Sequence, residues 1–225
     1  LKKAGLKRLT VSLDSLDART FKTMNGKGAL HQVLAGINKA EEAGFQSIKI
    51  NIVIQRGVND HQAVDMVRHF KNTPHVLRFI EYMDVGNCNH WEQKYVVPSQ
   101  ELIQRIKEHF PLKKIPGDYF GEVSERFRFE DGQGEIGFIS SVSQPFCRSC
   151  TRVRLSTDGK IYTCLFASEG SDVKKLLKEG KPDEEIAHFI RNVWQRREDR
   201  YSEIRSTLSP SQHPAPKVEM FQIGG

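Results

Sequence analysis

The chain has 225 residues, of which 38% are hydrophobic, enough to build the core of one or two domains. No apolar run approaches the roughly 20 residues of a membrane span, and the first residues lack the apolar segment of a secretory signal. The formal net charge of +6 favours an anionic partner, and a phosphorylated small molecule explains this charge as well as nucleic acid does. We therefore expect a soluble, cytoplasmic protein that makes no membrane contact.

The first hundred residues alternate short β-branched segments with segments of helical periodicity. The predicted strands span residues 7–13, 47–54 and 76–83. The predicted helices span residues 30–43, 99–110 and a segment after Asn59 or Asp60 that buries Ala63, Val64, Val67 and Phe70. This order predicts parallel strands joined by right-handed helical crossovers. Three strands cannot close a barrel, so the array is expected to be half of a larger one.

After Pro111 the pattern changes to short strands separated by glycines, and we place a domain boundary near residue 110. The predicted strands span residues 125–129, 135–142, 152–156 and 161–165. Asp158-Gly159 lies between the last two of these strands and predicts a hairpin.

A final helix is predicted to begin near Pro182. Its apolar face would consist of Ile186, Ile190, Val193 and Trp194. The segment from Arg191 to Arg205 holds the densest group of basic residues, but acidic residues are interspersed with them. This mixture predicts a solvated helix face rather than a nucleic-acid surface.

Three of the four cysteines follow a spacing that can bring them to one site. Cys147 and Cys150 form a CxxC pair, and Cys164 follows after thirteen residues, turned back toward the pair by the predicted hairpin. An iron–sulfur cluster accepts three thiolates and keeps one open iron. Zinc needs a fourth Cys or His, which no nearby residue supplies, and unliganded thiols are a third alternative. Cys88 lies alone and is interpreted as a loop thiol without a role.

Two arginines follow the CxxC pair at alternate positions of a strand. Arg152 and Arg154 lie on one face of that strand, and guanidinium groups form forks suited to phosphate. Their relation to the third cysteine depends on the turn. A two-residue turn pairs Cys164 with Val153 and directs the arginines to the opposite face, whereas a three-residue turn pairs Cys164 with Arg152. The sequence alone leaves both registers open.

Several motifs together resemble one known family. They are the CxxC pair with its third cysteine, the segments T-R-V-R and T-D-G-K-I, the strand segments V-S-L-D-S-L, K-I-N and R-F-I-E-Y-M, and the Gly-Gly end. In these motifs the whole chain closely resembles the GTP 3',8-cyclases of molybdenum-cofactor biosynthesis. The resemblance implies a lyase of the radical S-adenosylmethionine class that converts GTP to 3',8-cyclo-7,8-dihydro-GTP.

The resemblance also implies a fold and a set of site residues. The fold would be α/β, with the C-terminal half of an incomplete (βα)6 TIM-like barrel over residues 1–110. An α+β domain over residues 111–225 would carry a second 4Fe-4S cluster. The cluster ligands would be Cys147, Cys150 and Cys164. The GTP-binding residues would be Lys49, Arg78, Arg152, Val153 and Arg154. The contacts to S-adenosylmethionine would be Ser12 and Met83.

Four of these residues also have ordinary interpretations. Lys49 can be an exposed strand charge, Ser12 an ordinary strand residue, and Met83 a core residue. Arg78 lies between Val76 and Ile80 on one strand face, and a buried arginine needs an anion or a carboxylate. Either a GTP phosphate or Glu81 would satisfy it.

One departure from the family is large. The N-terminal CxxxCxxC motif, which binds the cluster that cleaves S-adenosylmethionine, is absent, and so are the first barrel strands. We therefore expect a truncated chain that is inactive alone, with S-adenosylmethionine and the N-terminal 4Fe-4S cluster belonging to the full-length enzyme. Gly224-Gly225 follow an extended tail, and the resemblance implies that they reach into the active site, which glycines permit by close backbone approach. The alternative is a frayed end.

The implied partners are GTP and a downstream pterin-forming enzyme. A homodimer is compatible with the sequence, and no nucleic acid or membrane is expected. The alternative to the enzyme is a zinc-stabilised module that binds nucleic acid. It predicts a colourless protein with one zinc ion, whereas the enzyme predicts a brown protein with about four irons per chain.

Overall fold

The computed structural model describes residues 1–26, 28–208 and 216–223. The chain divides into two compact units. Unit 1 comprises Leu1–Met83 and Glu92–Gln144, and unit 2 comprises Asp84–Trp91 and Pro145–Gly225. No helix in the described ranges is both long enough and apolar enough to cross a lipid bilayer.

Unit 1 is built, over its described residues, on a mixed sheet of six strands. Across the sheet their order is β1 (Leu9–Ser12), β2 (Ile48–Ile54), β3 (Val76–Glu81), β6 (Glu135–Ile139), β5 (Glu125–Phe129) and β4 (Leu112–Ile115). The first four are parallel, and β5 runs antiparallel to both of its neighbours. The α/β class with parallel strands is therefore confirmed. The sheet continues past residue 110 because β6 returns to pair with β3, and the division into functional domains at that residue stays a prediction.

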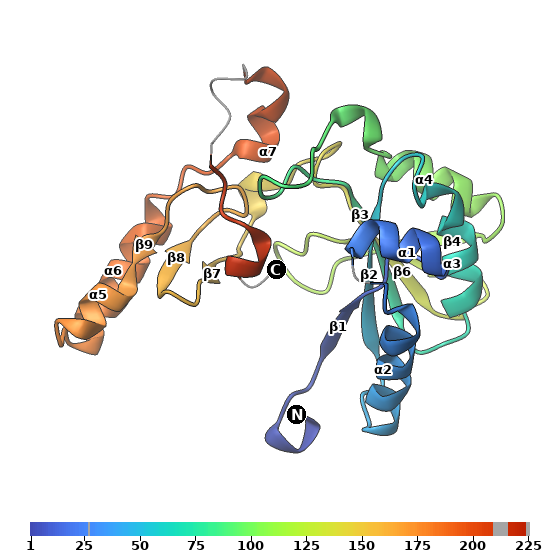
Figure 1. Cartoon of the computed structure of the whole chain (residues 1–225), viewed down its shortest axis with the longest axis horizontal. Coiled ribbons are helices and arrows are strands. Elements are labelled where there is room, and N and C mark those ends of the chain that lie inside the picture. Colours follow the sequence, from blue (N-terminus) through green and yellow to red (C-terminus); the bar gives the residue numbers. More distant parts are fainter. Residues whose placement is uncertain (27, 209–215, 224–225) are drawn as a thin grey trace. The chain divides into compact units, whose positions relative to one another are not determined.

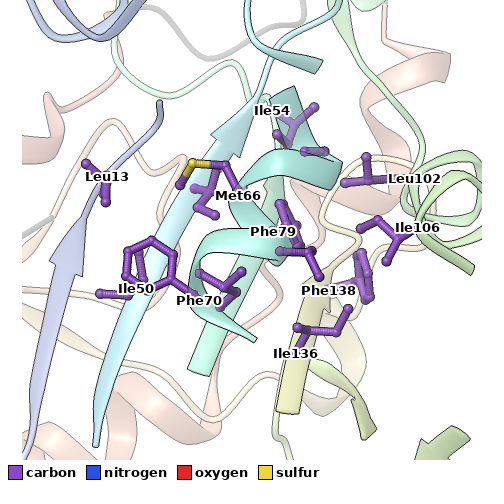
Figure 2. Packing of buried hydrophobic residues seen from close by; sticks show 14 of the residues in the cluster. Leu13, Ile50, Ile54, Met66, Phe70, Phe79, Leu102, Ile106, Ile136 and Phe138 are labelled. Carbon is purple, nitrogen blue, oxygen red and sulfur yellow. The ribbon is translucent and has the colours of Figure 1, made fainter. Parts of the chain in front are cut away.

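Helices cover one face of this sheet (Figure 1). They are α1 (Ala18–Asn25), α2 (Leu30–Glu42), α3 (Ala63–Phe70) and α4 (Ser99–Lys107). Alternate residues of β2, from Ile48 to Ile54, are at most 2% exposed and pack against them. Figure 2 shows Ile50, Ile54, Met66 and Phe70 in this packed layer. The intervening residues of β2, which include Lys49 and Asn51, lie on the opposite face, which we call the polar face.

Two elements of unit 1 are not predicted by the sequence. Helix α1 has a single buried side chain, Phe21, and therefore no apolar stripe. Its start is marked by Asp17, whose carboxylate accepts the Thr20 N–H at 2.8 Å. Strand β4 has two exposed lysines in its four residues and forms by pairing with β5.

Unit 2 has short elements. Its described residues form the antiparallel strands β7 (Arg154–Leu155), β8 (Lys160–Tyr162) and β9 (Ser171–Asp172), and the helices α5 (Val173–Lys178), α6 (Asp183–Gln195) and α7 (Tyr201–Ile204). Helix α6 begins after Pro182 as predicted. Its predicted apolar face is wrong in part, because Ile190 and Trp194 are 39% and 36% exposed.

The predicted solvated face between residues 191 and 205 is wrong for two arginines. The side chains of Arg197 and Arg205 are only 11% and 6% exposed. Each has protein partners in place of water, and these partners come from distant parts of unit 2.

Candidate functional site

The turn between β7 and β8 decides how the third cysteine meets the two arginines. A three-residue turn closes at Gly159, whose φ of +84° suits the last position of such a turn. Arg154 consequently lies opposite Tyr162. Continued two residues beyond the ladder, the same register sets Cys164 opposite Arg152. Of the two registers that the sequence allows, the chain adopts the one that brings these groups together.

The arginines and thiols of this hairpin also interact electrostatically. Burial lowers the pKa of Arg154 and the charge of Arg152 lowers it further, whereas Cys150 and Cys164 oppose the shift. Arg152 Nε donates to Cys150 Sγ at 3.4 Å. Burial opposes ionisation of Cys150, but the N–H groups and charge of Arg152 outweigh it and lower the thiol pKa. The hairpin therefore places cysteine sulfur and guanidinium groups side by side.

Cys147 completes the group of three thiols. It begins a 3-10 turn (Cys147–Ser149), which brings the first cysteine of the pair near the third. Cys164 Sγ accepts the Phe166 N–H at 3.4 Å. Burial raises the pKa of Cys164 against that hydrogen bond, and the charge of Cys147 adds to the rise. All three thiols are half-buried.

Arg197 joins the two segments that carry the cysteines. Its guanidinium donates to the carbonyls of Cys150 at 3.1 Å, Thr163 at 3.2 Å and Cys147 at 3.4 Å. Asp199 fixes the guanidinium through an ion pair at 3.3 Å. Because the CxxC turn and the strand end before the third cysteine share one donor group, Arg197 holds them in a fixed relation. The sequence predicts that this side chain is solvated, but it binds three backbone carbonyls instead.

The donor chemistry of the hairpin fits an iron–sulfur cluster. Three thiols, two of them accepting N–H groups at sulfur, match the thiolate ligation and sulfur hydrogen bonding of such clusters. Each thiolate of a cluster binds its own iron, so the thiolates need not converge on one atom. Within the described part of the chain, no three His, Cys, Asp or Glu side chains are arranged to hold a single metal ion. The donor types thus suit a cluster, and its binding at this hairpin stays a prediction.

The polar face of unit 1 carries the other predicted site residues. A row runs from Ser12 through Asn51 to Arg78, because these residues are register partners across β1, β2 and β3. Asn51 Oδ1 is buried and has no hydrogen-bond partner among the residues described. Since buried acceptors are normally satisfied, this row contains a group that a ligand can bind.

Lys49 lies on the same face, two residues before Asn51 on β2. Burial lowers the pKa of Lys49, and the charge of Arg78 adds to the shift, whereas Glu122 opposes it. By strand alternation the side chain lies on the polar face, where the cations Arg78 and Arg8 and the carboxylates Glu122 and Asp118 all act on it. An anionic ligand would offset the repulsion between Lys49 and Arg78.

Met83 follows the end of β3, and Glu81 fixes that strand end. The Glu81 carboxylate is 2% exposed. It accepts the N–H and hydroxyl of Ser99 at 2.7 and 3.0 Å and the N–H groups of Val142 and Ser143 at 2.8 Å. Because side chains alternate along β3, Glu81 points to the helix-covered side and Arg78 to the polar face.

Sequence reasoning misses three residues of this arrangement. Asn51 could have been found, because strand alternation alone places it on the face of Lys49. Glu81 appears in the sequence as a strand carboxylate, but its burial depends on partners far along the chain. Arg197 has no sequence signal, since its acceptors are carbonyls of residues 34 to 50 positions away.

Comparison with known proteins identifies relatives of the chain. The Radical SAM superfamily profile matches residues 1–70, and the Molybdenum Cofactor Synthesis C profile matches residues 75–203. A GTP 3',8-cyclase of Xanthomonas campestris pv. campestris is 52% identical over 226 residues, which cover the whole chain and 65% of that protein. The GTP 3',8-cyclases of Acidothermus cellulolyticus and Staphylococcus epidermidis are 45% and 42% identical, over the whole chain and 68% and 66% of their own lengths. The chain thus spans slightly less than two thirds of the Xanthomonas relative. It belongs to the family of the GTP 3',8-cyclases.

Proposed function

We propose that the chain forms part of a GTP 3',8-cyclase, a lyase that converts GTP to 3',8-cyclo-7,8-dihydro-GTP by radical S-adenosylmethionine chemistry in molybdenum-cofactor biosynthesis. The observation that carries this proposal is the hairpin register, which sets Arg152 and Arg154 on the side of the thiols. It joins a cationic site for phosphate to a three-thiol site within one unit. Family membership supports the reaction, and the hairpin supports a place for its substrate.

Unit 2 would provide the substrate-binding cluster of this enzyme. The residues that would hold the second 4Fe-4S cluster are Cys147, Cys150 and Cys164. When bound, this cluster supplies an iron without a protein ligand, to which the guanine base can bind. Arg152 and Arg154 hold the triphosphate through their guanidinium forks, with the Val153 backbone between them. Arg197 keeps both cysteine segments in place through their carbonyls.

Unit 1 would provide part of an incomplete (βα)6 barrel. On its polar face Lys49 and Arg78 bind GTP by charge, and Ser12 contacts S-adenosylmethionine together with Met83. Asn51 joins this set because its buried oxygen lacks a partner in the described structure. The radical-generating step belongs to the full-length enzyme, since the CxxxCxxC motif is not in this sequence. The cytoplasmic location, a downstream pterin-forming enzyme and a homodimer belong to the same proposal and are supported by the family alone.

GTP titration of the anaerobically purified chain tests the role of the arginines. Arg152→Ala and Arg154→Ala should each weaken GTP binding by about tenfold or more, because each removes a charge-assisted contact to phosphate. Arg148→Ala is the matched control, since Arg148 lies between the paired cysteines and its side chain is 79% exposed. Unchanged GTP affinity after removal of both arginines would contradict their assignment.

A further inference from the structure

The C-terminal segment (residues 217–223) is bound by a loop that is distant in sequence (residues 84–91), which we call the receiving loop. Both belong to unit 2. Asn87 contacts the segment as a neighbouring strand would: its Nδ2 donates to the Lys217 carbonyl at 2.7 Å and its Oδ1 accepts the Lys217 N–H at 3.0 Å. The Val218 N–H donates to the Ala167 carbonyl at 3.4 Å. The segment is thus held by its main chain.

Glu219 makes a second contact with the receiving loop. Its Oε1 accepts the Asn87 N–H at 2.9 Å. The same side chain forms a capping box with Gln222, which shapes the turn at the end of the segment. Gly86 leaves room for the carboxylate: a Cβ there would lie 2.1 Å from Glu219 Oε2, and the Gly86 φ is +65°. The loop is therefore shaped to accept this side chain.

The third contact is a buried ion pair. Lys217 Nζ donates to Asp84 Oδ2 at 2.8 Å and to the Asp84 carbonyl at 2.7 Å, and the two side chains are only 10% and 9% exposed. Tyr201 donates to the same carboxylate, and Arg205 pairs with it at 2.9 Å. Because a buried charge without a partner is costly, Asp84 ties Lys217 into the interior of the unit.

We propose that Asp84 and Asn87 are positioning residues for the end of the chain. Through Lys217 and Glu219 they fix the main chain as far as Ile223, which is 2% exposed. Gly224 and Gly225 follow Ile223 directly in the sequence and lie outside the described residues. The functional part of this inference rests on the proposed function, together with the expectation from the family resemblance that those glycines reach into the active site.

Hydrogen–deuterium exchange on the 225-residue chain tests the docking. Asn87→Ala removes both side-chain bonds to Lys217 at an exposed residue. Lys217→Met removes the ion pair but leaves Asp84 with Arg205 and Tyr201. We expect the amides of residues 217–223 to exchange about tenfold faster, or more, in both variants.

Phe221→Ser is the matched control for these variants. Phe221 lies in the same segment, but it is 77% exposed, so its replacement should leave the exchange rates unchanged. Rates in Asn87→Ala and Lys217→Met that equal those of the unsubstituted chain would overturn the docking role.

GTP affinity tests the positioning role. A chain that ends at Ile223 keeps every docking contact and loses only the glycines. We expect this truncation and Asn87→Ala to weaken GTP binding by similar factors, and their combination to add no further loss, because both act through the glycines.

Two results of this cycle would overturn the positioning role. One is an unchanged GTP affinity in Asn87→Ala. The other is an equal loss of GTP affinity from Asn87→Ala in the intact and truncated chains, because the effect of Asn87 would then not depend on the glycines. An unsubstituted chain that fails to bind GTP would instead overturn the proposed function, while the exchange rates still decide whether the docking contacts exist.

Discussion

The two units of this chain differ in the interactions that stabilise the interior of each. In unit 1 the isoleucines of β2 and the helices form a continuous apolar core. In unit 2 helix α6 has no buried residue, and distant segments are joined by Arg197 on backbone carbonyls and by Lys217 and Arg205 on Asp84. Apolar burial is spread over many contacts, whereas a buried ion depends on each of its partners. The unit that carries the cysteines therefore depends on a few polar side chains in addition to a small set of buried apolar ones, such as Ile161, Phe166 and Val173.

This difference bears on what each unit can do. A sheet with a packed core gives a rigid surface on which Lys49 and Arg78 keep their places. We expect a unit joined by single polar contacts to gain stability if its cysteines bind a metal cluster, because metal binding is coupled to folding. We therefore expect substitutions in unit 1 to act on stability, and polar substitutions in unit 2 to act on cluster content.

The largest effect is expected in the core of unit 1. Phe138 is fully buried, and its ring lies 5.5 Å from the rings of Phe79 and Phe127. Phe138→Ala should lower the free energy of unfolding by about 3–5 kcal/mol, because it leaves a cavity. Urea unfolding followed by circular dichroism measures the loss. Phe120→Ala, at an 82% exposed position of the same unit, should change stability by less than about 0.5 kcal/mol. A comparable loss in both variants would refute the assignment of the core.

A smaller loss is expected at Glu81, a buried carboxylate of unit 1. Glu81→Gln keeps the shape but directs an amide group toward N–H donors, so it should cost about 2–3 kcal/mol of unfolding free energy. The same urea experiment measures it. Glu92→Gln, at a side chain that is 55% exposed, serves as the control. An unchanged free energy of unfolding in Glu81→Gln would show that the end of β3 does not depend on the charge of Glu81.

In unit 2, Arg197→Met should reduce the iron content severalfold with only about 2 kcal/mol or less of lost stability, because it frees the cysteine segments from their shared donor. Arg197→Lys should retain an intermediate amount, since an ammonium cannot span three carbonyls as a guanidinium does. Iron analysis of anaerobically purified protein measures both. Arg196→Met, at the neighbouring exposed arginine, should keep its iron. A full iron content in Arg197→Met would show that cluster binding does not depend on Arg197.

The smallest effect concerns pH and His75. This side chain is 4% exposed, and its Nε2 lies 3.1 Å from Glu41. Burial lowers the pKa of His75 below its ordinary value of 6.5, and Glu41 only partly opposes the shift. The unfolded chain therefore binds more protons than the folded one as pH falls through 6.5, and stability is lost toward the folded pKa. Urea midpoints at several pH values measure this, and His75→Gln should flatten that part of the profile. An unchanged profile in His75→Gln would assign the loss to other groups.

Much of unit 1 could be predicted because its signals are local. Strand β2 and helix α3 follow the periods of their apolar residues, and the predicted boundaries differ from the observed ones by few residues. Helix α1 and strand β4 escaped prediction because pairing and capping, rather than an apolar stripe, stabilise them.

Less of the site could be predicted. The cysteine spacing and the paired arginines stand in the sequence, but their register depends on the turn that closes at Gly159. Arg197 and Asp84 act through partners that are distant in the chain, and local sequence patterns do not predict such partners. The cysteines and the paired arginines can therefore be identified from the sequence. The residues that hold them in place can be identified only from the fold.

The proposed function depends above all on the binding of a 4Fe-4S cluster by the three cysteines of unit 2. Iron, sulfide and zinc analysis of the anaerobically purified chain, with a visible absorption spectrum, tests it most directly. We predict about four irons with equal sulfide per chain, loss of both in Cys147→Ser, Cys150→Ser and Cys164→Ser, and retention in Cys88→Ser, at the exposed thiol of the receiving loop. One zinc per chain without sulfide would contradict the claim and favour the zinc-stabilised module instead.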